Sequence, residues 1–275
     1  MDILAEMLSF NFIVRALIVG ISVSLCASLL GASLVLKRYS MIGDGLSHVG
    51  YGALAIAAAL NLAPLQIAIP VVIIAAFFLL RLNRSSKLKG DALIALISCS
   101  ALSIGMIVIS VFEVNVDVNS YMFGSILALQ AEDVTLSLIS SAAVIILYFL
   151  FYNKIFAVTF DESFSKATGI KTDLYNAVIA LLTAVVIVVG MRLMGALLIS
   201  GLVIFPSLSA MRICKSYRGV TVLSVVISIV CFIAGLTITF YFPVPTGACI
   251  VVTNLAAFLI CTTAGKIRSH SALAK

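Results

Sequence analysis

Apolar residues along this chain fall in long runs that alternate with short polar connections. Nine runs come close to the ~20 residues that a helix needs to cross a bilayer. They cover 10–36, 42–62, 64–82, 92–112, 133–152, 174–191, 194–211, 220–241 and 246–265. A shorter apolar stretch, 121–130, is expected to be re-entrant or interfacial. The pattern predicts an all-α polytopic membrane protein with about 8–9 transmembrane helices, forming a single transmembrane domain over residues 1–275.

Composition supports this assignment and excludes several kinds of enzyme. The chain is 63% hydrophobic and 10% charged, whereas soluble domains are about 45–50% apolar and about 25% charged. Its six cysteines are scattered singly in apolar runs without a CxxC pair, so we interpret them as small buried hydrophobes. The sequence has no Walker A loop, HExxH or GxSxG pattern. We therefore expect no catalytic residues and no nucleotide bound through a P-loop.

The basic residues predict the orientation of the chain in the membrane. All of them except Arg15 and Arg192 lie on alternate connections or at the C-terminal end: Lys37, Arg38, Arg81, Arg84, Lys87, Lys89, Lys154, Lys166, Lys171, Arg212, Lys215, Arg218, Lys266, Arg268 and Lys275. Cytoplasmic loops carry such an excess. The N-terminus is therefore predicted outside and the C-terminus in the cytoplasm, and the net charge of +6 is a topology signal rather than a nucleic-acid patch.

Two connections are long enough to have a role of their own. The outer one, 113–133, holds four carboxylates and no Lys or Arg, so it is either a solvated loop or a funnel for cations. The inner one, 153–173, contains Phe160, Asp161 and Glu162 at the start of a predicted short helix that ends at Ala167 to Gly169. This helix is expected on the cytoplasmic surface. Phe160 and Phe164, at helical spacing, make it a candidate docking element.

The main candidate for chemistry is Asp44 with His48. Residues four apart share one helix face, and ionisable groups inside a membrane span usually face a cavity or a partner. Imidazole with carboxylate is a donor set suited to zinc, manganese or iron(II), although a bonded polar pair with a structural role is the alternative. Nearby glycines thin the helix, so that an ion or another backbone can approach. Two donors are too few for a closed site, so further ligands would come from another span, water or a second copy.

The run 194–211 is the other unusual span. It contains Gly195 and Gly201, several small residues, and Pro206 in mid-run. A proline inside a helix kinks or breaks it, and small residues permit close helix packing. The run is therefore either a packing seam or a broken helix that lines a transport pathway.

Five stretches together resemble one family. Residues 34–48, LVLKRYSMIGDGLSH, resemble the signature of permease subunits of bacterial ABC importers for zinc, manganese and iron, the ABC-3 family. In that family a basic residue precedes a Ser-x-x-Gly-Asp-x-x-Ser-His run. Further resemblances follow in order at 121–127, 160–169, 195–206 and 245–251.

The resemblance implies a type II ABC importer-like permease in the bacterial cell membrane. The implied assembly is a homodimer, surrounded by membrane lipid, with two cytoplasmic ATP-binding subunits and an extracytoplasmic metal-binding protein. Asp44 and His48 would line the path, and no cofactor would be bound permanently. The segment of about 153–173 would couple to the ATPase, through Phe160, Asp161, Glu162, Phe164, Ala167 and Gly169.

The transported ion is expected to be Zn²⁺, with Mn²⁺ as the second choice. Residues 209–212, Ser-Ala-Met-Arg, look closer to zinc members of the family. The alternative functions are a stand-alone, ion-coupled metal carrier and a non-transporting scaffold. The carrier should show an inverted repeat, and none is apparent in the sequence. The scaffold leaves Asp44 and His48 unexplained.

Overall fold

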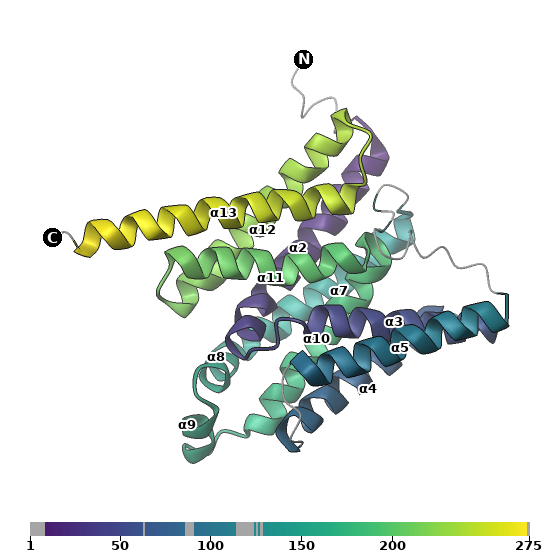
Figure 1. Ribbon diagram of the computed structural model, residues 1–275, viewed down its shortest axis with the longest axis horizontal. Coiled ribbons are helices and arrows are strands. Elements are labelled where there is room, and N and C mark those ends of the chain that lie inside the picture. Colours follow the sequence, from purple (N-terminus) through teal and green to yellow (C-terminus); the bar gives the residue numbers. More distant parts are fainter. Residues whose placement is uncertain are drawn as a thin grey trace.

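The computed structural model describes residues 9–62, 64–85, 91–113, 124, 126 and 129–273. Nine long helices match the nine apolar runs (Figure 1). They are α2 (Asn11–Leu36), α3 (Ile42–Ala59), α4 (Pro64–Ser85), α5 (Asp91–Val111), α7 (Ala131–Leu150), α10 (Thr172–Met194), α11 (Ala196–Ile213), α12 (Tyr217–Tyr241) and α13 (Thr246–Leu273). Two short helices, α8 (Tyr152–Phe160) and α9 (Glu162–Ala167), lie between α7 and α10. The prediction of an all-α polytopic fold is confirmed.

Seven of the described helices are long and apolar enough to cross a membrane by composition alone: α2, α5, α7, α10, α11, α12 and α13. The helix α3 does not reach that standard, and the part of α4 whose side chains are described, Gln66–Leu79, is apolar but shorter. The helix α3 carries Asp44, His48 and four glycines, which lower its hydropathy. It nevertheless packs among α4, α5, α10 and α11.

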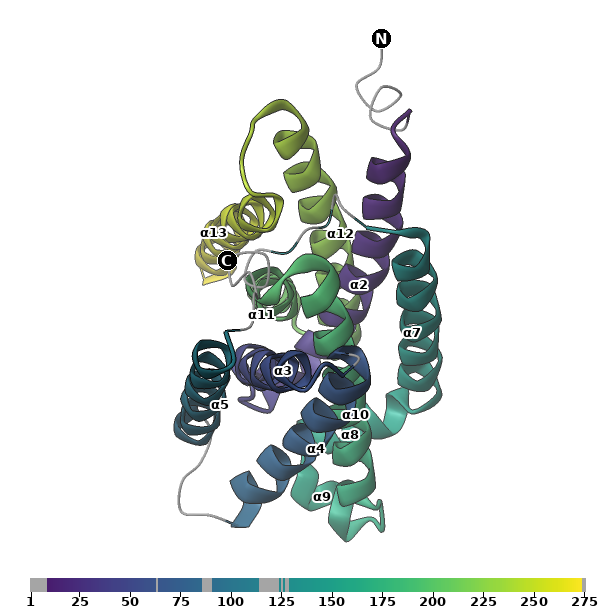
Figure 2. The same cartoon turned by 90° about the vertical axis from the view of Figure 1, so that its right-hand side faces the viewer.

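The helices form a buried centre and an apolar periphery. In α10, 72% of the apolar window is buried, whereas the value is 22% in α5 and α7 and 17% in α13. Figure 2 shows α5 and α13 on one side of the bundle and α7 on the other, with α2, α3 and α11 between them. A helix that is apolar on all sides and largely exposed is stable only where the surrounding medium is apolar. The outer helices therefore face lipid.

The two basic residues that lie off the predicted cytoplasmic connections have polar partners. The guanidinium of Arg15 donates a hydrogen bond to the carbonyl of Leu129 at 3.3 Å, and that of Arg192 lies 3.6 Å from the carboxylate of Asp133. Both partners belong to the region just before and within the first turn of α7. These contacts explain why two arginines can lie on the predicted outer side. They also attach this end of α7 to α2 and α10.

Candidate functional site

Asp44 and His48 lie one turn apart in α3, as the spacing predicted. The Nε2 atom of His48 is 3.6 Å from the Oδ2 atom of Asp44. The side chain of Asp44 is 44% exposed and that of His48 is 17% exposed. The imidazole is therefore largely enclosed, while the carboxylate opens to the surface of the single chain.

The glycines around the pair admit neighbouring helices. A Cβ atom on Gly45 would lie 2.6 Å from Ile94 in α5, and one on Gly52 would lie 2.8 Å from the carbonyl oxygen of Ala101. Such distances are shorter than carbon atoms tolerate, so only glycine allows α5 to pack this closely. Of the two roles predicted for these glycines, close approach of another backbone is observed at Gly52, whereas Gly45 admits the side chain of Ile94.

The first turn of α3, which carries Asp44, packs beside α11. Gly43 faces Ser200 in α11, with 3.6 Å between its ideal Cβ position and the Cα atom of Ser200. Ser200 is twelve residues from Arg212 at the other end of α11, or about 18 Å at the rise of an α-helix. The carboxylate and the imidazole are thus remote from the basic end of α11. Their neighbours place them beside the part of α11 that follows Gly195.

One chain supplies two donors at this place. Among the described residues, no group of three or more His, Cys, Asp or Glu side chains could hold a metal ion together. The Nδ1 atom of His48 is buried without a hydrogen-bond partner among those residues. The half-exposed Asp44 can still accept a ligand or a partner from outside the chain. The described residues thus place one carboxylate and one imidazole together here.

The inner connection between α7 and α10 forms two helices, where one was predicted. Asp161 is the N-cap of α9, since its carboxylate accepts a hydrogen bond from the backbone N–H of Phe164 at 2.8 Å. The helix ends at Ala167, and Gly169 follows with a φ of 82°. The predicted start at Phe160 was wrong, because residues 152–160 form the separate helix α8, which ends there. Extended backbone at Asp161 divides the two helices.

This division changes the predicted docking surface. Phe160 is 78% exposed and Phe164 is 66% exposed. They do not lie one turn apart on one helix, since Phe160 ends α8 and Phe164 lies in α9. Both aromatic side chains nevertheless stay accessible at the turn around Asp161. The predicted coupling residues Glu162, Ala167 and Gly169 also lie in or beside α9.

A buried lysine links this segment to the helical core, a role that was not predicted from the sequence. Lys37 is the C-cap of α2, and its side chain is 9% exposed. Its Nζ atom donates a hydrogen bond to Oδ1 of Asn176 in α10 at 2.6 Å and lies 3.5 Å from Oε2 of Glu162 in α9. The sequence feature that could have indicated a buried polar contact is Asn176, a single amide in an otherwise apolar run.

The span that contains Pro206 is not broken at the proline. The helix α11 continues through Pro206 to Ile213, so of the two alternatives left open for this span, a break at the proline is not the one observed. The chain instead breaks at Gly195, which ends α10 and begins α11 with φ 93° and ψ 154°. Gly201 faces Val251 of α13, at 3.1 Å from its ideal Cβ position. Gly201 therefore serves packing, while Gly195 is the discontinuity in the backbone.

Part of the predicted motif set lies outside the described residues. This is true of most of 121–127 and of the basic connection between α4 and α5. In the described part of the outer connection, Ile126 and Leu129 are buried at 3% and 7% exposure and join the main hydrophobic core. The outer connection therefore contributes apolar side chains to the core next to α7.

Comparisons with known proteins agree with this architecture. The chain is 29% identical over 251 residues to the manganese import system permease protein ScaB of Streptococcus gordonii, covering 91% of this chain and 90% of that protein. It is 25% identical to the high-affinity zinc uptake system membrane protein ZnuB of Haemophilus influenzae, covering 91% and 97%. The solved structure of PsaBC from Streptococcus pneumoniae in complex with Fab matches with a TM-score of 0.83 at 30% identity, covering 94% of both chains.

The fold and the site thus define a multi-pass membrane permease with a polar pair inside its helical bundle. The family model of the ABC 3 transport family matches residues 9–265, and the chain belongs to that family. It is the permease subunit of a metal ABC importer.

Proposed function

We propose that two copies of this chain form the path for a divalent transition metal, with zinc preferred over manganese. The observation that carries the proposal is the Asp44–His48 pair, held 3.6 Å apart inside the bundle with the carboxylate half-exposed. A second copy related by a twofold axis would bring a second carboxylate and a second imidazole. Four donors suit a transition-metal ion, whereas two do not close a site.

The donor chemistry supports zinc as the first choice. Imidazole nitrogen suits zinc, whereas manganese prefers carboxylate, carbonyl and water oxygen. The Nε2 atom of His48 lies on the side of Asp44, whereas its Nδ1 atom is buried without a partner among the described residues. Manganese remains the competing substrate, because relatives named for each metal are similar to this chain.

We further propose the partners that an ABC permease requires. Two ATP-binding subunits would dock on the cytoplasmic face, and a metal-binding protein would deliver the ion from the other side. The exposed Phe160 and Phe164 side chains, at the turn between α8 and α9, offer apolar anchors for a groove in the ATPase subunit.

The basic connections support an outside N-terminus and a cytoplasmic C-terminus in a bacterial cell membrane. Membership of an ABC family argues against the stand-alone carrier.

The test is metal uptake by the reconstituted complex, with zinc and manganese in competition. Asp44→Ala and His48→Ala should each lower uptake by at least the ~10–100-fold that loss of a supporting group at a metal site costs. His270→Ala, which removes the chain's other histidine, is the matched control and should transport normally. Uptake at the wild-type rate in both site variants would refute the metal path, and a preference for manganese in the wild type would refute zinc.

A further inference from the structure

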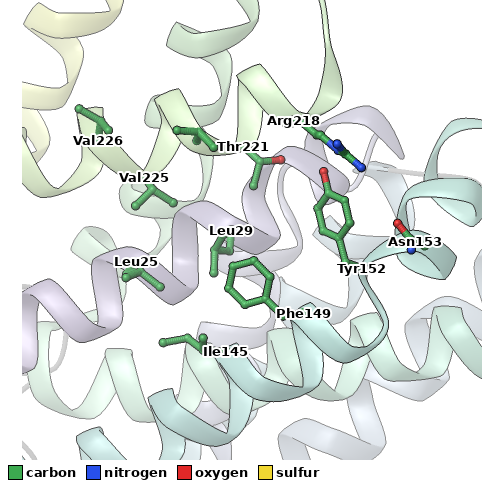
Figure 3. Close-up of a pocket in the computed structure, with 11 residues that line it drawn as sticks. Leu25, Leu29, Ile145, Phe149, Tyr152, Asn153, Arg218, Thr221, Val225 and Val226 are labelled. Atoms are coloured by element: carbon green, nitrogen blue, oxygen red, sulfur yellow. The ribbon is translucent and has the colours of Figure 1, made fainter.

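A pocket of about 580 Å³ lies on the outside of the bundle, away from Asp44 and His48. It is bordered by α2, α7, α12 and the start of α8 (Figure 3). Its volume falls within the ~300–1,000 Å³ of ligand sites. The wall is formed mainly by aliphatic and aromatic side chains: Leu25, Leu29, Ile145, Phe149, Val222, Val225 and Val226. Such a wall favours a hydrocarbon occupant.

The pocket has the length of a lipid chain segment. On α12 it extends from Arg218 to Val226, or about 12 Å at the rise of an α-helix. One leaflet contributes about half of the ~30 Å hydrocarbon core. The pocket therefore covers most of the depth of one leaflet. Val222 and Val226 are 64% and 50% exposed in the chain, so the pocket is open along its side to the membrane.

Polar groups gather at one end only. Figure 3 shows Arg218, Tyr152 and Asn153 together at that end, while Leu25, Ile145 and Val226 lie at the other. Arg218 is exposed and forms no ion pair with any described residue. It follows the predicted cytoplasmic connection between α11 and α12, at the level where phosphate groups of the inner leaflet lie. A guanidinium binds phosphate oxygens in a bidentate manner.

We propose that this pocket is a binding site for an anionic phospholipid of the cytoplasmic leaflet. An acyl chain would lie along Leu25, Phe149 and Val225, and the headgroup phosphate would bind Arg218, with the amide of Asn153 and the hydroxyl of Tyr152 as further donors. The assignment to the cytoplasmic leaflet rests on the proposed orientation of the chain. The choice of an anionic lipid rests on Arg218 alone.

A second copy of the chain is a less suitable occupant. In a twofold interface around an axis along the membrane normal, the same surface faces itself at the same depth. The two Arg218 guanidinium groups would then face each other across an apolar contact, and like charges at close range are destabilising. A phospholipid supplies the opposite charge at the polar end and hydrocarbon along the rest.

The experiment measures the lipids retained by the full-length chain. The chain is purified in mild detergent and incubated with equal amounts of phosphatidylglycerol and phosphatidylcholine, and native mass spectrometry counts each lipid bound. The wild type should retain phosphatidylglycerol in preference. Arg218→Ala should lower that preference about five-fold, the effect expected for one basic residue near the headgroups. Lys215→Ala, an exposed basic residue on the same connection that does not border the pocket, should leave it unchanged.

Two further variants make the result decisive. Val225→Phe reduces the space for an acyl chain and should lower the retention of both lipids. Val222→Cys, placed in a variant without the six native cysteines, should form no disulfide-linked dimer on oxidation, because this face of the chain would contact lipid and not the second copy. The proposal is wrong if Arg218→Ala retains phosphatidylglycerol as the wild type does, or if Lys215→Ala loses it equally. A disulfide-linked dimer of Val222→Cys in membranes would identify the occupant as a second copy instead. Lipid retention is measured without metal or ATP, so its failure is distinguishable from failure of the metal path.

Discussion

Lys37 donates a hydrogen bond to Asn176 across 2.6 Å, and the contact joins the end of the first span to the beginning of α10. Both side chains are shielded from solvent, with 9% exposure at Lys37 and 5% at Asn176. A buried ammonium group is costly unless it is paired and hydrogen-bonded. Glu162 supplies the second partner from α9. The lysine therefore connects the proposed coupling segment with two core helices.

We predict that Asn176→Leu destabilises the protein, because it leaves the buried Lys37 ammonium with one acceptor fewer. The expected loss is about 1–3 kcal/mol, the cost of an unsatisfied buried polar group. Glu162→Gln should have a smaller effect, since the Glu162 side chain is 43% exposed and water screens its charge. The chain has no tryptophan, so unfolding is followed with a thiol-reactive dye that reports exposure of the buried Cys26 and Cys231.

The double variant Lys37→Met with Asn176→Leu provides the control. It removes both partners together, so no buried donor is left unsatisfied, and stability should recover relative to Asn176→Leu alone. If the changes that Lys37→Met and Asn176→Leu make to the free energy of unfolding are simply additive, then the short hydrogen bond between the two side chains does not stabilise the protein.

The helices could be predicted from the sequence because each is a long apolar run bounded by polar residues or glycine. The short helix predicted over 160–169 exists as α9, which starts two residues later, but the preceding helix α8 over 152–160 was not predicted. The boundary between α8 and α9 is extended backbone at Asp161, where the side-chain cap on Phe164 replaces a glycine signal. Propensity alone does not locate such a boundary.

The candidate site was only partly predictable. The spacing of Asp44 and His48 placed both on one face of a helix, because that relationship is local. The role of Lys37 could not be found in this way. Its partners Glu162 and Asn176 are 125 and 139 residues away, and a lysine that ends an apolar run also fits a topology signal. Similarly, Pro206 left a packing seam and a broken helix as alternatives, because the sequence does not show that α11 packs against α2, α12 and α13 and runs through the proline.

We predict that the coupling surface includes Phe164. Phe164→Asp should weaken association with the ATP-binding subunit, because a charge would be buried against an apolar groove. Ser163→Asp introduces the same charge at the neighbouring exposed position of α9 and should have a smaller effect. Co-purification of the ATP-binding subunit with each variant is the measurement. Equal co-purification of both variants and the wild type would show that the subunit docks elsewhere.

We predict that α9 and the connection between α11 and α12 face the cytoplasm. In a variant without native cysteines, Lys166→Cys and Lys215→Cys should resist an impermeant thiol reagent in intact cells, because the basic connections stay inside. Both positions are exposed in the structure, so protection would come from the membrane rather than from burial. Val244→Cys, in the connection between α12 and α13, is 41% exposed and should be labelled from outside. The reverse labelling pattern would invert the proposed orientation.

We predict that Gly195 is required for the sharp junction between α10 and α11. Its φ of 93° and ψ of 154° lie in a region that residues with a Cβ atom rarely adopt, at a cost of about 1–3 kcal/mol. Gly195→Ala should therefore lower the unfolding temperature or displace α11, which carries Ser200 towards Gly43 and the adjacent Asp44. Gly169→Ala is the matched control for stability: it also has a positive φ, of 82°, but nothing lies within 4 Å of its Cβ position. Dye-monitored unfolding is measured on both variants, whereas zinc uptake is compared between Gly195→Ala and the wild type, because Gly169 belongs to the proposed coupling segment. Loss of uptake in Gly195→Ala at equal assembly would show that this junction positions the metal path, whereas uptake at the wild-type rate would limit Gly195 to a structural turn.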